Sequence, residues 1–154
     1  MSNVLFGLFC LALLVTFVTD FLYLIIHRAA TLLLIPFFLL ASTYGLTPVT
    51  FSESLFGICI GYGFLWLFNA LYARFRQRDG IGQGDFELLA TIGSYLGIEG
   101  VLFSMTLGSC IGSLFAILLL VLKRADAQTA LPFGSFLVLG CFVYMTLIYL
   151  HLIS

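Results

Sequence analysis

Long apolar runs constrain what this chain can fold into more than any other feature. The longer runs have about 20 residues each, the length that an α-helix needs to cross a bilayer, and short polar connections separate them. Hydrophobic residues make up 62% of the 154 residues and charged residues only 8%, against about 25% charged residues in a soluble domain. The pattern predicts an all-α, polytopic membrane protein that lies in a lipid bilayer, with residues 1–154 forming a single membrane-embedded domain.

The apolar runs predict six transmembrane helices, of which the fourth is short. The first run is interpreted as a helix rather than a signal peptide, because it lacks a basic start and a small-residue cleavage site before Asp20. Thr50 and Glu53, at the start of the third run, have the spacing of a capping box. The predicted helices are Val4–Ile26, Ala29–Tyr44, Phe51–Tyr72, Asp85–Leu96, Ile98–Leu122 and Pro132–Ile153.

The basic residues predict how these helices are oriented. All of them fall in the connections after the first, third and fifth predicted helices, and none follows the second or the fourth. By the positive-inside rule the odd-numbered connections face the cytoplasm and both termini face outward. A count of five or seven helices would break this segregation, so it favours six. The basic residues are Arg28, Arg74, Arg76, Arg78, Lys123 and Arg124.

Composition and motifs exclude several classes of function. A net charge of −1 argues against nucleic-acid binding, which needs a basic surface. The four cysteines are scattered singly with no CxxC pair, which indicates neither a zinc site nor a disulfide framework. No phosphate-binding loop is present. We therefore expect no metal and no cofactor, and the sequence assigns no oligomeric state.

Two aspartates are the candidate catalytic residues. Asp20 lies in the last third of the first predicted helix and Asp85 opens the fourth, so the predicted topology places both near the cytoplasmic face. An acid in or beside a bilayer is costly and is by default a functional candidate. If the two carboxylates meet, repulsion leaves one protonated while the other is ionised. Aspartic proteases use that arrangement to activate water against an amide carbonyl.

The glycines before Asp85 suit an active-site loop. Gly82 and Gly84 permit positive φ and a close approach of backbone, so an extended substrate could lie beside them. Asp85 is expected at the N-cap of its helix, where the helix dipole favours a negative charge. An Asp after Gly is by itself often only a cap, so the pairing with Asp20 carries the argument.

Three segments of the chain resemble the type IV prepilin peptidases, the membrane aspartyl proteases of pilus and type II secretion systems. The stretch GIGQGDFELLATIGSYLG at 80–97 resembles that family's GxGxGDxKLLAxxGxxxG motif. After Asp20, Ile26 and Thr31 match the ends of an Ile-Pro-Asn/Asp-x-Leu-Thr segment, whereas His27 and Arg28 depart from it. The stretch LPFGSFL at 131–137 is similar to the opening of the family's last helix.

The resemblance implies a function and a location. It implies that Asp20 and Asp85 are the catalytic pair of an endopeptidase in the bacterial cytoplasmic (inner) membrane. The enzyme would cut the basic leader of a type IV prepilin or pseudopilin after a glycine at the cytoplasmic face. Pilin, pseudopilin and Flp-type pilin substrates all fit. Full-length members carry an N-terminal methyltransferase segment with a tetracysteine zinc site, which this sequence does not contain, so we expect the short, peptidase-only form.

One departure from the motif concerns charge. Glu87 stands where the family usually has lysine, and a third acid so close to Asp85 makes Glu87 a possible modulator of the pair.

Two other interpretations stay open. The GxGD motif is shared with signal-peptide-peptidase-type proteases, but those carry a Tyr-Asp first motif, whereas Thr19 precedes Asp20 here. The chain could instead be a non-enzymatic membrane scaffold or a small proton or ion carrier that uses Asp20 and Asp85 as a relay. A carrier would need further polar residues along a path through the membrane.

Overall fold

The computed structural model describes residues 3–77, 80–122 and 131–150. This part of the chain is all-α and contains five helices. They are α1 (Asn3–Tyr23), α2 (Arg28–Thr43), α3 (Phe51–Arg76), α4 (Gln83–Val121) and α5 (Phe133–Tyr149).

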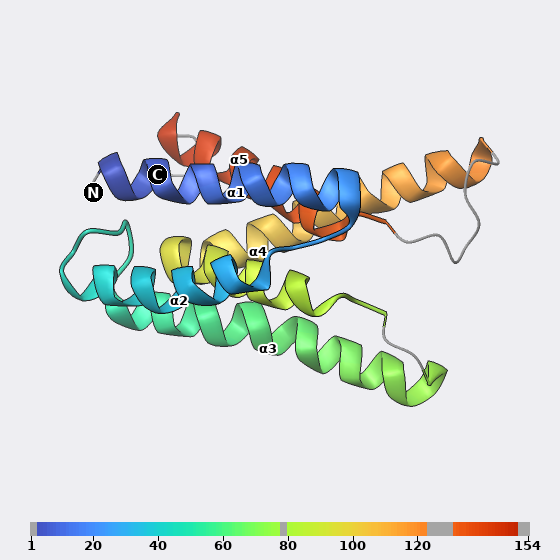
Figure 1. Cartoon of the computed structure of the whole chain (residues 1–154), viewed down its shortest axis with the longest axis horizontal. Helices are drawn as coiled ribbons and strands as arrows, with labels where there is room; N and C mark the ends of the chain where they lie inside the picture. The colour runs from blue at the N-terminus through green and yellow to red at the C-terminus, as the bar shows by residue number, and fades with distance from the viewer. Residues whose placement is uncertain (1–2, 78–79, 123–130, 151–154) are drawn as a thin grey trace.

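The longest helix, α4, is interrupted at Gly97, whose backbone has φ 70° and ψ −164°. The chain turns back there: a Cβ at Gly93 would lie 2.9 Å from Val101 Cγ2, although eight residues of straight helix span about 12 Å. Figure 1 shows the segment before Gly97 running towards the left and the segment after it returning. The two segments correspond to the fourth and fifth predicted helices.

The prediction of six transmembrane helices is not confirmed. Three helices, α1, α3 and α4, are long and apolar enough to cross a membrane, and α2 and α5 are apolar but shorter. Several predicted boundaries were also displaced: α1 ends at Tyr23 rather than Ile26, α3 continues to Arg76, and α4 begins at Gln83 rather than Asp85. The predicted end of the last helix, Ile153, lies outside the described residues.

The start of α3 agrees with the sequence. The Thr50 side chain accepts a hydrogen bond from the Glu53 N–H, and the Glu53 carboxylate accepts one from the Thr50 N–H. The predicted capping box is therefore confirmed.

The surface is largely apolar, and the interior combines a hydrophobic core with many polar residues. Large apolar side chains such as Leu33, Phe75 and Leu114 are exposed, whereas many buried positions are polar. In lipid an apolar surface is favourable, and polar groups must find partners inside the bundle. The buried polar residues are Thr16, Asp20, Thr31, Ser42, Thr47, Ser54, Asp85, Glu87, Thr91, Ser94, Ser104 and Ser135.

Small residues hold the helices close around α4, which packs against α2, α3 and α5. The backbones of Gly57 in α3 and Gly93 in α4 are so close that a Cβ on either would overlap the other. In the second segment of α4, a Cβ at Gly108 would lie 2.9 Å from the Phe136 carbonyl oxygen of α5. Glycine at these positions lets the helix backbones approach within van der Waals distance. The close packing holds α4 in position against α3 and α5.

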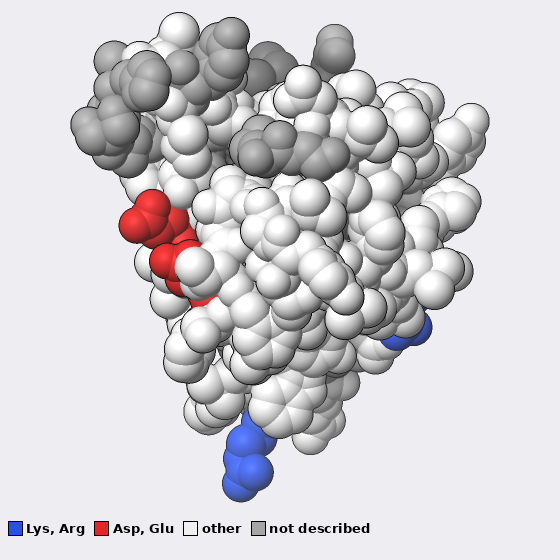
Figure 2. All heavy atoms as spheres, turned by 90° about the vertical axis from the view of Figure 1, so that its left-hand side faces the viewer, with Lys and Arg blue, Asp and Glu red and all other residues white. Residues whose placement is uncertain are grey.

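The two ends of the bundle differ in their basic residues. The ends of α1 and α3 and the starts of α2, α4 and α5 lie together at the right of Figure 1, and the described basic residues, Arg28, Arg74 and Arg76, belong to this end. Figure 2 shows the opposite end, where acidic side chains gather and basic ones are visible only at the margins. The exposed acidic residues there are Glu53 and Glu99. Three other basic residues used in the topology prediction, Arg78, Lys123 and Arg124, lie outside the described part.

Candidate active site

The first carboxylate, Asp20, comes from the last turn of α1 and is only 5% exposed. Its Oδ2 accepts two hydrogen bonds from Ser135, one from the backbone N–H at 2.6 Å and one from the hydroxyl at 2.8 Å. Ser135 is the third residue of α5, so its N–H is one of the helix-end donors that lack an intrahelical partner. The α5 N-terminus therefore stabilises negative charge on Asp20.

The second carboxylate, Asp85, lies in the first turn of α4 and is 7% exposed. It is the third residue of the helix, and the N-cap is Gly82, whose carbonyl accepts the Asp85 N–H at 3.1 Å. The expectation that Asp85 is itself the N-cap was therefore wrong. The helix begins at Gln83, and its N-cap is Gly82, three residues before Asp85. Its acidic side chain still lies where the helix dipole favours it.

The segment before Asp85 is held by Asn69 of α3. Its side-chain oxygen accepts hydrogen bonds from the N–H groups of Gly80 at 2.8 Å and Ile81 at 3.1 Å. These contacts satisfy backbone donors outside a helix, and such donors need partners when they are shielded from water. They also fix the approach of the chain to Gly82 and the first turn of α4.

The two carboxylates converge on Gly134 at the start of α5. A Cβ built on Gly134 would lie 3.0 Å from Asp85 Oδ1 and 3.1 Å from Asp20 Oδ2. Those two oxygens are therefore at most about 6.1 Å apart, the sum of the two distances. The structure brings together the two aspartates that the sequence singled out, at one end of the bundle, and both are buried.

The connection between α1 and α2 closes the site from one side. Leu24 has a left-handed φ of 55° and its N–H donates to the Asp20 carbonyl at 2.8 Å, so α1 ends abruptly there. The chain then places Ile26 against the backbone of the site. A Cβ at Gly84 would lie 2.8 Å from Ile26 Cβ, and one at Gly134 would lie 2.7 Å from Ile26 Cδ1.

These contacts correct the role expected for the active-site glycines. Gly82 has φ −68°, and Gly84 lies inside α4; in the described residues only Gly45 and Gly97 have positive φ among glycines. Conformational freedom is therefore not the reason for glycine at 82 or 84. Position 84 needs glycine because Ile26 occupies the space that a side chain at this position would fill.

Glu87 does not face the pair. Its carboxylate is 2% exposed and binds Arg28, with Oε1 2.6 Å from Nη2 and 2.8 Å from Nε. Oε2 accepts a hydrogen bond from the Thr31 hydroxyl at 3.2 Å. Arg28 and Thr31 belong to the first turn of α2, so Glu87 ties that helix to α4 two residues after Asp85.

Sequence reasoning gave no role to Ser135, Gly134 or Asn69. The first two lie in the LPFGSFL segment, and their match to a family motif was the only signal that pointed to them. Asn69 is a polar residue in an apolar run, and no motif pointed to it. A hydrogen bond between residues 115 positions apart, as between Asp20 and Ser135, cannot be predicted from local pattern.

The chain is similar in sequence to several proteins described as prepilin leader peptidase/N-methyltransferases. A prepilin leader peptidase/N-methyltransferase of Xanthomonas campestris pv. campestris is 33% identical over 92 residues, which are 60% of this chain and 32% of the relative. The protein of the same description from Pseudomonas aeruginosa is 32% identical over 102 residues, 66% of this chain and 35% of the relative. The one from Neisseria gonorrhoeae is 36% identical over 75 residues, 49% of this chain and 26% of the relative.

The first two of these matches span about a third of the relatives' length. No solved structure matches the chain with significance. A sequence profile of the type IV leader peptidase family matches residues 7–117, most of the chain and both aspartates included. The chain therefore belongs to the type IV leader peptidase family.

Proposed function

We propose that this protein is an aspartic endopeptidase and that Asp20 and Asp85 are its catalytic pair. The observation that carries the proposal is the convergence of two buried carboxylates, at most about 6.1 Å apart, on Gly134. Retaining a pair of like charges in a largely apolar bundle is costly unless the pair shares a proton or does chemistry. Family membership and the names of the relatives, which describe leader peptidases, support the same function.

The geometry suggests a division of labour within the pair. Both Ser135 donors point at Asp20 Oδ2, so the proposal gives Asp20 the role of general base and assigns the shared proton to Asp85. In the reaction Asp20 takes a proton from water, whose oxygen attacks the scissile carbonyl carbon. Asp85 meanwhile donates its proton to the carbonyl oxygen. The tetrahedral intermediate then collapses as the C–N bond breaks, and the amine leaves with a proton returned through the pair.

The proposed substrate is a type IV prepilin or pseudopilin, cut after the glycine that joins a short basic leader to an apolar helix. The relatives are named for prepilin leaders. A basic leader would remain in water while the apolar helix stays in lipid, so the bond between them arrives at the membrane interface. Asp20 in the last turn of α1 and Asp85 in the first turn of α4 lie together at one end of the bundle, which is where such a bond would be presented.

The proposed membrane arrangement has six crossings, with α4 supplying two through its reversal at Gly97. In this arrangement the basic end, which holds Asp20 and Asp85, faces the cytoplasm according to the positive-inside rule. The termini and the end shown in Figure 2 then lie on the outer side of the inner membrane.

Cleavage of a peptide by the purified protein tests this function. The peptide carries a basic leader, a glycine and an apolar helix, and its products are identified by mass spectrometry in detergent. Asp20→Asn and Asp85→Asn should each lower the rate about a thousandfold or more, because members of a catalytic unit cannot work alone. Glu53→Gln, at the opposite end of the bundle, is the matched control and should cut normally.

Folding is checked separately by the thermal unfolding of each variant. If either folded Asn variant cuts at the wild-type rate, the pair is not catalytic. The carrier or scaffold alternative would then be the better account.

A further inference from the structure

The start of α5 has no cap of its own. Its N-cap is Pro132, whose side chain makes no cap hydrogen bond. The N–H groups in the first turn of a helix lack intrahelical partners and need acceptors when they are buried. Ser135, which is 0% exposed, donates its N–H to Asp20 Oδ2 of α1 at 2.6 Å. Asp20 therefore caps α5 from another helix.

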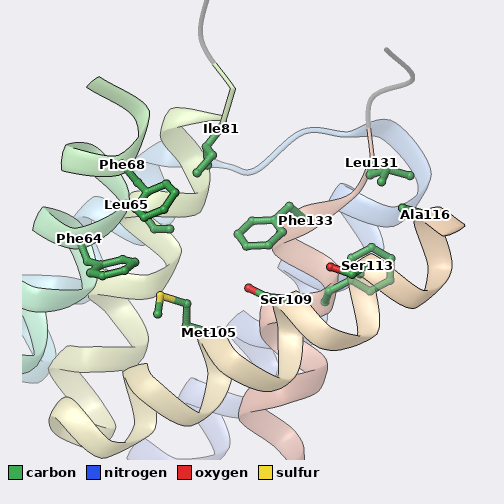
Figure 3. Close-up of a pocket in the computed structure, with 12 residues that line it drawn as sticks. Phe64, Leu65, Phe68, Ile81, Met105, Ser109, Ser113, Ala116, Leu131 and Phe133 are labelled. Atoms are coloured by element: carbon green, nitrogen blue, oxygen red, sulfur yellow. The ribbon is translucent and has the colours of Figure 1, made fainter. Parts of the chain in front are cut away.

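Apolar anchors fix the direction of this first turn. A pocket of about 450 Å³ lies between α3, the second segment of α4 and the start of α5, and Phe133 and Phe136 are among its lining residues. Figure 3 shows Phe133 directed into the pocket, and the centroid of the Phe136 ring lies 5.4 Å from that of Phe115 in α4. Residues three apart share one side of a helix. These two rings therefore seat α5 against α4, while Ser135 contacts α1.

The Ser135 hydroxyl makes a second contact with the same carboxylate oxygen. It donates to Asp20 Oδ2 at 2.8 Å, and the Phe17 carbonyl, 3.2 Å away, is an alternative acceptor for its single proton. A hydroxyl rotates to suit its acceptors and has lone pairs that can accept hydrogen bonds. The hydroxyl can therefore stay hydrogen-bonded when Asp20 takes a proton, as the proposed reaction requires.

The two carboxylate oxygens of Asp20 thus have different surroundings. Oδ2 accepts two hydrogen bonds from Ser135, whereas no donor among residues 3–77, 80–122 and 131–150 binds Oδ1. Hydrogen bonds to an ionised carboxylate are among the strong ones in proteins, and the carboxylate cannot rotate without breaking both of them. Oδ1 is therefore the oxygen that is free to accept a proton.

We propose that Ser135 is the positioning residue of the catalytic pair: it holds Oδ2 of Asp20 and leaves Oδ1 as the oxygen that takes the proton from water. This inference rests on the proposed peptidase function and names the reacting atom within it. In that step a water O–H bond breaks as the Oδ1–H bond forms, and the water oxygen bonds to the scissile carbonyl carbon. Asp85 supplies its proton to the carbonyl oxygen. Ser135 does not touch the substrate and acts only through Asp20.

Kinetics of two variants test this role. Ser135→Ala keeps the N–H and loses the hydroxyl, so the carboxylate of Asp20 is held by one hydrogen bond and can rotate. Its kcat should fall about tenfold or more, because misplacing a reacting group by about 1 Å can cost about 100-fold. KM should stay unchanged, since Ser135 does not bind the peptide. Ser135→Thr keeps the hydroxyl and should restore most of kcat.

The matched control is Ser54→Ala. Ser54 is also a fully buried serine, and its hydroxyl donates to the Ser94 carbonyl of α4 at 2.7 Å, near the opposite end of the bundle. Both alanine variants lose a hydrogen bond between helices and should unfold at lower temperature than the wild type, but only Ser135→Ala should lower kcat. Equal kcat in folded Ser135→Ala and Ser54→Ala would overturn the role. So would a Ser135→Thr protein that is as stable as the wild type and as slow as Ser135→Ala.

A measurement without substrate separates this inference from the peptidase function. NMR of ¹⁵N-serine-labelled protein in detergent reports each serine N–H, and the Ser135 signal is identified by its loss in Ser135→Ala. A short hydrogen bond to a carboxylate shifts an amide proton downfield, so the Ser135 signal should move upfield in Asp20→Ala while that of Ser54 should not. A moved signal supports the hold on Asp20 even where no cleavage is seen. An unmoved signal would contradict it, whether or not the protein cuts the peptide.

Discussion

At the scale of single residues, the site is held by contacts between distant parts of the chain. Ser135 supports Asp20, Asn69 holds the segment before Asp85, and the ion pair of Arg28 and Glu87 ties α2 to α4 beside the site. That pair is unusual in its polarity. The motif that this chain resembles has asparagine or aspartate at position 28 and usually lysine at position 87, whereas here a basic Arg28 and an acidic Glu87 form the ion pair.

Exchanging the charges tests whether this pair positions the site. Arg28→Asp alone and Glu87→Lys alone each bring like charges together and should lower kcat, by up to about 100-fold if the α1–α2 connection moves by about 1 Å. The double variant restores an opposite-charge pair and should recover about tenfold, within the range found for residues in direct contact. The measurement is kcat and KM for one peptide across the four proteins.

The control for this cycle is Arg74→Asp, since Arg74 lies at the same end of the bundle and does not contact Glu87 in the described contacts. A double variant no better than the product of its single variants would show that the pair does not act as a unit.

Residue-level features differed in how far the sequence could predict them. Asp20 and Asp85 could be recognised because acids are rare in apolar runs and the positive-inside pattern places both at one end. Glu87 was predicted as a possible modulator of the pair, and its direction was not predicted. Residues two apart differ by about 200° around a helix, and Glu87 points towards Arg28 of α2. Ser135 and Asn69 are small polar residues whose importance comes only from long-range contacts.

At the scale of helices, α4 determines the architecture, because its reversal at Gly97 lets its first segment carry Asp85 while its second lines the pocket. The sequence predicted a boundary there, between Leu96 and Ile98, but not that the two segments would join without a loop. Glycine is the only residue that readily adopts φ 70° with ψ −164°. Helix propensity alone could not show that the reversal occurs at Gly97. Gly93 and Gly100 lie nearby in the sequence and are also glycines, but both have helical backbone.

Replacing Gly97 by alanine should therefore destabilise the protein by about 1–3 kcal/mol, the usual cost of such a backbone conformation in a residue with a side chain. A Cβ there would also lie 3.2 Å from Val49 Cγ1. Thermal unfolding in detergent measures the effect. Gly63→Ala in α3 is the control: no heavy atom lies within 4 Å of its built Cβ, and it should be neutral or slightly stabilising. Equal stability of the two variants would mean that Gly97 does not need its conformation.

At the scale of the whole molecule, the apolar exterior and the position of the basic residues suit the proposed arrangement, in which the bundle lies in a membrane with the end that holds Asp20 and Asp85 towards the cytoplasm. This orientation is tested by single cysteines in a protein whose native cysteines have been replaced. Pro48→Cys and Glu99→Cys should react with an impermeant thiol reagent added from outside the inner membrane. Arg74→Cys should react only after permeabilisation. The reverse pattern would place the aspartates on the wrong side for a cytoplasmic leader.

If Asp20 of α1 and Asp85 of α4 form one site, cysteines at these two positions can be cross-linked. In the same cysteine-free background, Asp20→Cys is combined with Asp85→Cys and treated with a short thiol-bridging reagent, and the bridged peptides are identified by mass spectrometry. Asp20→Cys with Glu87→Cys is the matched control, because Glu87 lies two residues further along α4 and faces α2. The account predicts rapid bridging of 20 with 85 and little of 20 with 87. Bridging of 20 with 87 alone, or of neither pair, would contradict it.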